Sequence, residues 1–429
     1  MKRIIRYSAI LLAAAACADP ADPQISNVRL EQNNLSRRVT VKYNLDEAAV
    51  VTMDVLTNGV SIGGANIQHV SGDCFRKVAA GNDHVVEWDP YLSWPDQKFG
   101  AGVVSVRMTA WALDNTPDYM AVDITATGGA DTQTYYPAAD FVPGGVTNNL
   151  YKTTKLLMRK IMAKGVEWTM GSVAESGRNT IREASHQVTL TSNYYIGVYE
   201  VTQAQWQQIT GYNPSNFTTD RTMRPVEKVC YTDIRQGKGT ASTAASATGG
   251  VYPAPPYDDS FLGLLRDKTK LDFDLPSEAQ WEFAARAGNG DGYWGDGSAM
   301  RIISGKDAGL DLLGRYQYNG GKIGANSDTE PEADCEVING TAIVGSYQPN
   351  AWGLYDMYGN VWEWCLDSFT DDITLLNGTV NTEGNSRMIR GGSWSSNAGG
   401  CRSAYRNLFW PVNRSINGGF RVVCTAGLQ

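Results

Sequence analysis

The chain has 429 residues, and its 37 Lys and Arg residues against 45 Asp and Glu residues give a formal net charge of −8. Such a balance provides no basic surface for a phosphate backbone, so we exclude nucleic acid as the partner. The length exceeds that of a typical single domain and predicts two. The 45 Gly, 21 Tyr and 12 Trp residues favour a loop-rich fold in which flat aromatic side chains supply much of the buried area.

The N-terminal stretch "MKRIIRYSAILLAAAAC" is typical of a targeting segment. Lys2, Arg3 and Arg6 precede an apolar run that is too short to span a bilayer. Small residues then lead to Cys17, as in a bacterial lipoprotein signal whose cysteine carries lipid after cleavage. We therefore expect residues 1–17 to be a lipoprotein signal segment, with a plain secretory signal as the alternative. The mature protein would be exported and held on a membrane of the cell envelope by lipid on Cys17, facing the periplasm or the cell surface.

Export also brings the chain into an oxidising compartment, where cysteines can pair. Their connectivity does not follow from spacing. The cysteines concerned are Cys74, Cys230, Cys335, Cys365, Cys401 and Cys424.

The first predicted domain, residues 22–118, has the period-two alternation of short strands. The segments "RRVTVKYNL", "AVVTMDVLTNGVSI", "HVVEWD" and "VVSVRMTAWAL" carry this pattern. Several short strands at this spacing predict an all-β sandwich of the immunoglobulin or fibronectin type. No chemistry-bearing motif occurs in it, so we interpret it as a spacer or docking module.

A Gly-, Thr- and Pro-rich stretch within residues 119–150 predicts a linker and the start of the second domain, residues 151–427. "KLLMRKI" and "HQVTLTSNYYIGVYEV" are predicted strands. Two helix starts follow in "VTQAQWQQI" and "LPSEAQWEFAARAG", where Thr202 with Gln205 and Ser277 with Gln280 match the capping-box spacing.

The second domain also carries a series of motifs in a familiar order. They are "WTMGS", "YYIGVYEVTQAQW", "RPVEKV", "LPSEAQWEFAARAG", "NAWGLYDMYGNVWEWCLD" and "RGGSW…CRSAYRN…NRSINGGFRV". Together they resemble the formylglycine-generating enzyme, or sulfatase-modifying factor, family. The resemblance implies an α+β fold of the C-type-lectin-like kind with little regular secondary structure.

The family's chemistry depends on two cysteines, and only one is matched here. The resemblance implies oxidation of a sulfatase cysteine to formylglycine by oxygen and a copper(I) ion held by two thiolates, the ligands that soft copper(I) prefers. Cys401 matches the second cysteine, whereas Ser396 stands at the first and Asn397 at the neighbouring histidine. Cys365 and Cys424 are expected on packed segments away from the cleft. We therefore do not expect copper, and Cys401 is a catalytic candidate only if another donor completes the pair.

Further positions that match the family or carry exposed aromatics form a predicted binding site for a small ligand or a partner protein. In "NLFWPVN" we expect Leu408, Phe409 and Trp410 to lie in a loop as an apolar patch, with core packing as the alternative. The predicted binding residues are Trp362, Ser393, Trp394, Ser396, Asn397, Phe409 and Trp410.

The resemblance also implies calcium, a hard cation that takes oxygen ligands. One site would use the side chains of Asp356 and Glu363 with the carbonyls of Gly359 and Val361. A second calcium site would involve Asn319 with the backbone carbonyl of Gly320. The alternative is structural: Asp356 caps a turn and Glu363 pairs with an arginine. We expect most C-terminal arginines to form ion pairs, namely Arg390, Arg402, Arg406, Arg414 and Arg421.

Three functions remain open from sequence. The leading one is an exported lipoprotein whose second domain binds a ligand or protein without oxidase activity. The alternatives are a divergent formylglycine-generating oxidase acting on exported sulfatases, and a display protein diversified within residues 395–417.

The lipid anchor is directly testable by Cys17→Ala. We expect this variant to leave the membrane fraction for the soluble fraction, because the acyl chains on Cys17 are the expected attachment. Membrane fractionation measures where the protein is located, and mass spectrometry of the N-terminal peptide measures whether Cys17 carries lipid. A wild-type protein that is already soluble, with a mature N-terminus beyond Cys17, would contradict the lipoprotein interpretation.

Overall fold

A computed structural model describes most of the chain and divides it into two compact units. Unit 1 comprises residues 1–121, 133–148 and 426–429, and unit 2 comprises 122–132 and 149–425. The described residues are 5–7, 22–33, 35–95, 103–126, 132–175, 177–217, 222–236, 255–290, 294–295, 305–319 and 340–425. Cys17 and Cys335 lie outside these ranges.

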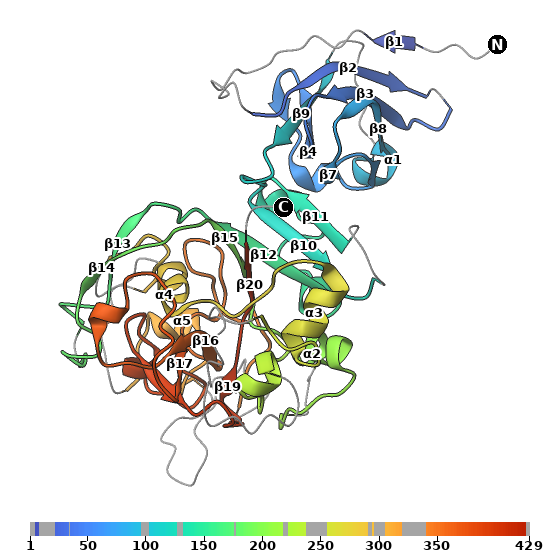
Figure 1. The fold of residues 1–429 in the computed structure, drawn as a ribbon. Helices are drawn as coiled ribbons and strands as arrows, with labels where there is room; N and C mark the ends of the chain where they lie inside the picture. The colour runs from blue at the N-terminus through green and yellow to red at the C-terminus, as the bar shows by residue number, and fades with distance from the viewer. Residues whose placement is uncertain are drawn as a thin grey trace. The chain divides into compact units, whose positions relative to one another are not determined.

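Unit 1 is built from two antiparallel sheets (Figure 1). The first has the order β1-β2-β3-β8-β6, and in the second β4 pairs with β5, β7 and β9. The first sheet comprises β1 (Ile5–Tyr7), β2 (Ile25–Gln32), β3 (Val39–Leu45), β8 (Gly81–Trp88) and β6 (Val70–Gly72); the second comprises β5 (Val60–Ser61), β4 (Ala49–Thr57), β7 (Arg76–Val78) and β9 (Val104–Trp111). The short helices η1 (Gly64–Asn66) and α1 (Pro90–Ser93) connect them.

The predicted strand segments of unit 1 are confirmed as β3, β4 with β5, β8 and β9. Burial alternates along β3, as the period-two pattern requires. Asn58 and Gly59 both have positive φ, which is the backbone of the tight hairpin turn that their sequence predicts.

The segment predicted as a linker is more ordered than expected. Residues 119–150 include β10 (Tyr119–Asp123), β11 (Gln133–Tyr136), η3 (Ala139–Phe141) and the start of η4 (Asn149–Lys152). Within unit 1, the Tyr135 amide donates a hydrogen bond to the Phe75 carbonyl at 2.8 Å, and the Tyr135 side chain is buried. The linker prediction was wrong here because buried tyrosines, rather than the glycines around them, determine the local structure.

Unit 2 holds three small sheets and short helices, in agreement with the expected low content of regular structure. Its strand pairings are β12-β15-β20, β13-β14 and β18-β17-β16-β19. The strands are β12 (Lys155–Ile161), β13 (Glu167–Met170), β14 (His186–Thr189), β15 (Tyr194–Gly197), β16 (Trp362–Ser368), β17 (Arg387–Arg390), β18 (Asn407–Phe409), β19 (Gly418–Gly419) and β20 (Val423–Thr425). The helices are α2 (Gln203–Thr210), η5 (Thr232–Gln236), α3 (Phe261–Thr269), α4 (Glu278–Arg286), α5 (Leu310–Leu313), η6 (Ile373–Leu375) and η7 (Ala398–Cys401).

Helices α2 and α4 begin where the capping-box motifs predict. In each, the N-cap hydroxyl accepts from the backbone of the third residue, whose glutamine side chain accepts from the N-cap amide. Helix α4 ends at Arg286, and its C-cap residue Ala287 adopts a left-handed conformation one residue before Gly288.

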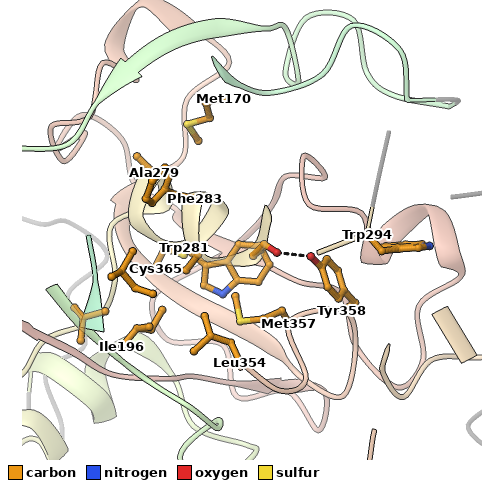
Figure 2. Packing of buried hydrophobic residues seen from close by; sticks show 14 of the residues in the cluster. Met170, Ile196, Ala279, Trp281, Phe283, Trp294, Leu354, Met357, Tyr358 and Cys365 are labelled. Carbon is orange, nitrogen blue, oxygen red and sulfur yellow. Dashed lines mark hydrogen bonds between the residues drawn. The ribbon is translucent and has the colours of Figure 1, made fainter. Parts of the chain in front are cut away.

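The core of unit 2 surrounds α4 (Figure 2). Trp281 is fully buried, and its indole N–H donates to Glu363 Oε2 on β16 at 2.8 Å. Figure 2 also shows Tyr358, whose hydroxyl donates to the Ala285 carbonyl. Aromatic rings with satisfied polar ends thus tie the helix to the neighbouring loops.

All five of these C-terminal arginines form ion pairs with acidic side chains. For four of the arginines both partners are buried, and the exception is Arg414, which is half-exposed. Their pairs are Arg390 with Glu278 and Glu282, Arg402 with Glu175 and Glu183, Arg406 with Glu278, Arg414 with Asp233, and Arg421 with Glu363. Burial opposes ionisation of Glu282, but Arg286 and Arg390 outweigh it and lower the pKa of this carboxyl below its usual value. The expected structural role of these arginines is therefore confirmed.

Within the described ranges, no helix has the length and apolar character needed to cross a bilayer.

Candidate functional site

A tight turn of serines occupies the centre of the predicted site. Ser393 Oγ lies 3.1 Å from Ser396 Oγ and 3.2 Å from Ser395 Oγ. The Ser396 hydroxyl accepts from the Ser393 amide at 3.1 Å, and its own amide donates to the Ser393 carbonyl at 2.9 Å. The Ser396 oxygen is thus engaged in closing the turn.

Cys401 lies directly behind this turn and is fully buried. A Cβ atom at Gly392 would come within 2.5 Å of Cys401 Sγ, and Gly392 has a φ of 76°. Only glycine fits both requirements, which gives the Gly-Gly pair a structural reason. Burial raises the pKa of the Cys401 thiol to about 12, so at neutral pH it stays protonated.

Every described cysteine is a free, buried thiol. Cys365 lies in β16 and Cys424 in β20, as expected for packed segments. Burial raises the pKa of both thiols. A nucleophile or metal ligand needs the thiolate, which these surroundings disfavour.

The remaining predicted binding residues separate into buried and accessible ones. Trp394 is buried, and its indole N–H donates to the Ile416 carbonyl at 3.1 Å. Trp362 is also largely buried, its ring centroid 5.9 Å from that of Tyr405. Asn397 is exposed, and its side-chain oxygen caps η7 by accepting from the Gly400 amide.

The segment that contains Phe409 and Trp410 differs from the predicted loop. Residues Asn407–Phe409 form β18, the edge strand beside β17, and Phe409 packs its ring against Trp364 at 5.6 Å. The loop prediction was wrong at these positions because backbone pairing with β17 and the Trp364 contact hold them. Trp410 comes directly after the strand and keeps 52% of its surface exposed.

Trp410 begins a turn that is fixed at several points, and we call residues 410–415 the aromatic loop. The Asn413 amide donates to the Trp410 carbonyl at 2.9 Å, and the Ser415 carbonyl accepts from Lys228 at 2.9 Å. Arg414 forms two hydrogen bonds with Asp233 of η5, at 2.8 and 2.6 Å. An exposed indole is therefore presented on a rigid support, beside the exposed Val412.

The predicted calcium residues lie next to the serine turn, because the Trp394 amide donates to the Asn360 carbonyl at 2.8 Å. Asp356 is buried, and its Oδ2 accepts from the Gly345 amide at 2.7 Å. Its Oδ1 has no hydrogen-bond partner. Glu363 instead receives two hydrogen bonds from Arg421, both 2.7 Å long.

Glu200 joins these residues, and the sequence interpretation missed it. Its carboxylate accepts from Asn360 Nδ2 at 2.6 Å and from the Val361 amide at 3.1 Å. The sequence signal was an acidic residue within the apolar run "IGVYEV", which is unusual unless its charge is satisfied. The three carboxylates of Glu200, Asp356 and Glu363 form what we call the buried acidic cluster.

Electrostatics in this cluster favours protonation. Burial, followed by the charges of Asp356 and Glu363, raises the pKa of Glu200 well above its usual range. Burial also raises the pKa of Asp356 to about 6, although the Gly345 hydrogen bond and Arg421 oppose the change. Burial and mutual repulsion therefore favour the protonated forms of Glu200 and Asp356.

Asn319, the side chain predicted for the second calcium site, forms hydrogen bonds within its own turn. Asn319 accepts from the Tyr316 amide at 2.8 Å and donates to the Gly314 carbonyl at 2.8 Å, which closes a local turn. Residue 320 lies outside the described ranges. In the part of the chain that is described, no group of three or more His, Cys, Asp or Glu side chains is placed to hold a metal ion.

Comparison with known proteins identifies the family. Residues 146–426 match the Sulfatase-modifying factor enzyme 1-like domain. The chaperone protein LppX of Paenibacillus barcinonensis is 30% identical over 245 residues, 55% of this chain and 81% of that protein. The formylglycine-generating enzyme of Streptomyces coelicolor is 36% identical over 163 residues, 36% of this chain and 47% of the enzyme.

Among solved structures, Treponema denticola variable protein 1 aligns with a TM-score of 0.45 and 24% identity, covering 63% of this chain and 96% of that one. The match to the formylglycine-generating enzyme spans about half of that enzyme's length, whereas the domain match covers nearly all of unit 2. On the strength of the domain match, the chain belongs to the sulfatase-modifying factor family.

Proposed function

We propose that this protein binds another protein through its second domain and does not oxidise sulfatase cysteines. The observation that carries the proposal is the residue types at the two positions that match the family's cysteine pair: a serine, Ser396, stands at the first, and a buried, protonated thiol, Cys401, at the second. Copper(I) held by two thiolates would supply oxygen activation at this place. The residues present do not fit it, because they offer one soft donor and one hard donor.

The nature of the partner is supported by the relative LppX, which is named a chaperone protein and matches over 81% of its length. The aromatic loop supplies a suitable contact surface. Exposed Trp410 is held on a turn that the Arg414–Asp233 pair fixes, so little conformational freedom is lost on binding. The partner we infer is therefore a polypeptide with exposed apolar side chains.

The location we propose is the bacterial cell envelope, with lipid on Cys17 as the membrane anchor. Unit 1 is then proposed as a spacer or docking module. Its two antiparallel sheets support an immunoglobulin- or fibronectin-like sandwich as this spacer.

Calcium is proposed as a structural ligand of the buried acidic cluster. Asp356 Oδ1 is a buried anionic oxygen without a partner, which suits a hard cation. Glu363 is engaged by Arg421, so the carbonyls of Gly359 and Val361 would have to supply much of the coordination. A bound cation would also relieve the repulsion among the three carboxylates.

The absence of oxidase activity is testable with a sulfatase Cys-x-Pro-x-Arg peptide, copper and oxygen. We expect no change in peptide mass and no tight copper(I) dithiolate, since a single thiol is present at the site. Ser396→Cys should increase copper(I) affinity without producing turnover, because Asn397 also departs from the family pattern. Copper-dependent formylglycine formation by the wild type that is lost in Cys401→Ala would establish the oxidase instead.

Protein binding is testable by suppression of aggregation of a chemically unfolded model protein, measured by light scattering. We expect Trp410→Ala to weaken the suppression about tenfold or more, the size of a typical hot-spot loss. Tyr91→Ala removes an exposed aromatic side chain from unit 1 and serves as the control. Equal suppression by wild type and Trp410→Ala would exclude the aromatic loop as the contact surface.

The calcium proposal predicts a higher melting temperature in calcium than in chelator, because an ion that binds the folded state stabilises it. Asp356→Ala should abolish this difference, whereas Asp356→Asn keeps an oxygen ligand and should retain part of it. Glu363 variants are less informative, since they also break the Arg421 pair. Identical wild-type melting in calcium and chelator would remove the ion from this site.

A further inference from the structure

A second candidate site lies in unit 2 away from the serine turn. It is a cavity of about 370 Å³ between α3, η5, β15 and β20, and we call it the α3 pocket. Strands β15 and β20 are paired, and Asp274 forms two backbone hydrogen bonds with Val423 of β20, both 2.8 Å long. Backbone hydrogen bonds therefore hold this part of the pocket wall. The volume is within the range of small-molecule sites, about 300–1,000 Å³.

One arginine of the pocket is fully neutralised. Arg235 donates to both oxygens of Asp274, at 2.8 and 2.9 Å, and its side chain is only 4% exposed. Asp274 Oδ1 also accepts from the Leu275 amide at 2.8 Å. This bidentate pair forms a fixed and electrically balanced part of the wall.

The second arginine, Arg266 of α3, is left with weak partners. Its Nε donates to the Phe273 carbonyl at 2.6 Å, which fixes the side chain in the pocket. Its terminal nitrogens reach only the already engaged Asp274 at 3.4 Å and Asp272 at 3.7 Å. Asp272 is 67% exposed and hydrated, so it satisfies this guanidinium poorly. Arg266 therefore presents a positioned cationic fork with spare donors.

The rest of the lining combines apolar and neutral polar groups. Leu275, Leu366 and Val423 form apolar wall, while Ser192 and Gln280 add groups that can form hydrogen bonds. A guanidinium fork matches the two oxygens of a carboxylate. Apolar wall beside it suits a short hydrocarbon substituent.

We propose that the α3 pocket binds an organic carboxylate, with its oxygens on Arg266 and its apolar part against Leu275, Leu366 and Val423. This proposal does not rest on the protein-binding function proposed for the aromatic loop. The same chemistry occurs in the C-terminal end of a peptide and in a free short-chain carboxylic acid.

Calorimetric titration of the full mature protein distinguishes these sources. The probes are the peptide Ala-Ala-Leu and 4-methylpentanoate, each compared with its neutral amide. We expect saturable binding of at least one carboxylate and loss of binding by its amide. Tighter binding of Ala-Ala-Leu would identify a peptide C-terminus as the ligand, and tighter binding of 4-methylpentanoate would identify a free short-chain carboxylic acid. If neither carboxylate binds saturably, or if the amides bind equally well, the proposal is overturned.

Two variants test the residue assignment in opposite directions. Arg266→Met should weaken carboxylate binding about tenfold or more, because hydrogen bonds to charged groups are the stronger kind. Asp272→Asn should tighten carboxylate binding several-fold, because the substitution removes the anion that competes for Arg266. The Asp272 side chain is exposed, so we expect the variant to fold. Arg182→Met, which alters a half-exposed arginine paired with Asp371, is the matched control and should change nothing. If the carboxylate affinity is unchanged in both single variants, Asp272→Asn and Arg266→Met, the assignment of Arg266 as the carboxylate-binding residue is refuted.

Discussion

Buried arginine–carboxylate pairs are the interaction on which unit 2 depends. Arg390 and Arg406 both contact Glu278 at the start of α4, and Arg390 also contacts Glu282 one turn later. These pairs join the C-terminal motif to a helix more than 100 residues earlier. Burying charges is unfavourable unless each is paired, and removing one partner of such a pair typically costs about 3–5 kcal/mol. A fold with so little sheet and helix relies on these contacts for its topology.

The need to pair buried charges and to pack buried side chains explains several of the family's motif residues without reference to its chemistry. Gly392 is required because Cys401 packs against it, and Arg421 is required because Glu363 is buried. Such residues define the fold whether or not the oxidase reaction takes place. The copper chemistry that the resemblance implies would need a thiolate at position 396, where a serine hydroxyl closes a turn instead. Membership of the family is therefore compatible with the proposed absence of its copper chemistry.

Sequence reasoning predicted features that depend on local patterns. The capping boxes at Thr202 and Ser277 follow from hydrogen bonds within a few residues. It failed where distant contacts decide the structure. Strand β18 exists because β17 pairs with it, and Glu200 belongs to the acidic cluster because Asn360 contacts it from 160 residues away. No local pattern carries that information.

The aromatic loop and the α3 pocket share one short element. Asp233 of η5 holds Arg414 of the loop, and Arg235, two residues later, holds Asp274 of the pocket. A carboxylate that binds beside Arg266 without moving η5 leaves the loop unchanged. If it binds better to a shifted η5, protein binding at the loop must change, and by linkage the bound protein must change carboxylate affinity by the same factor. Helix η5, a short π-helical turn, is therefore the element through which any such coupling would have to pass.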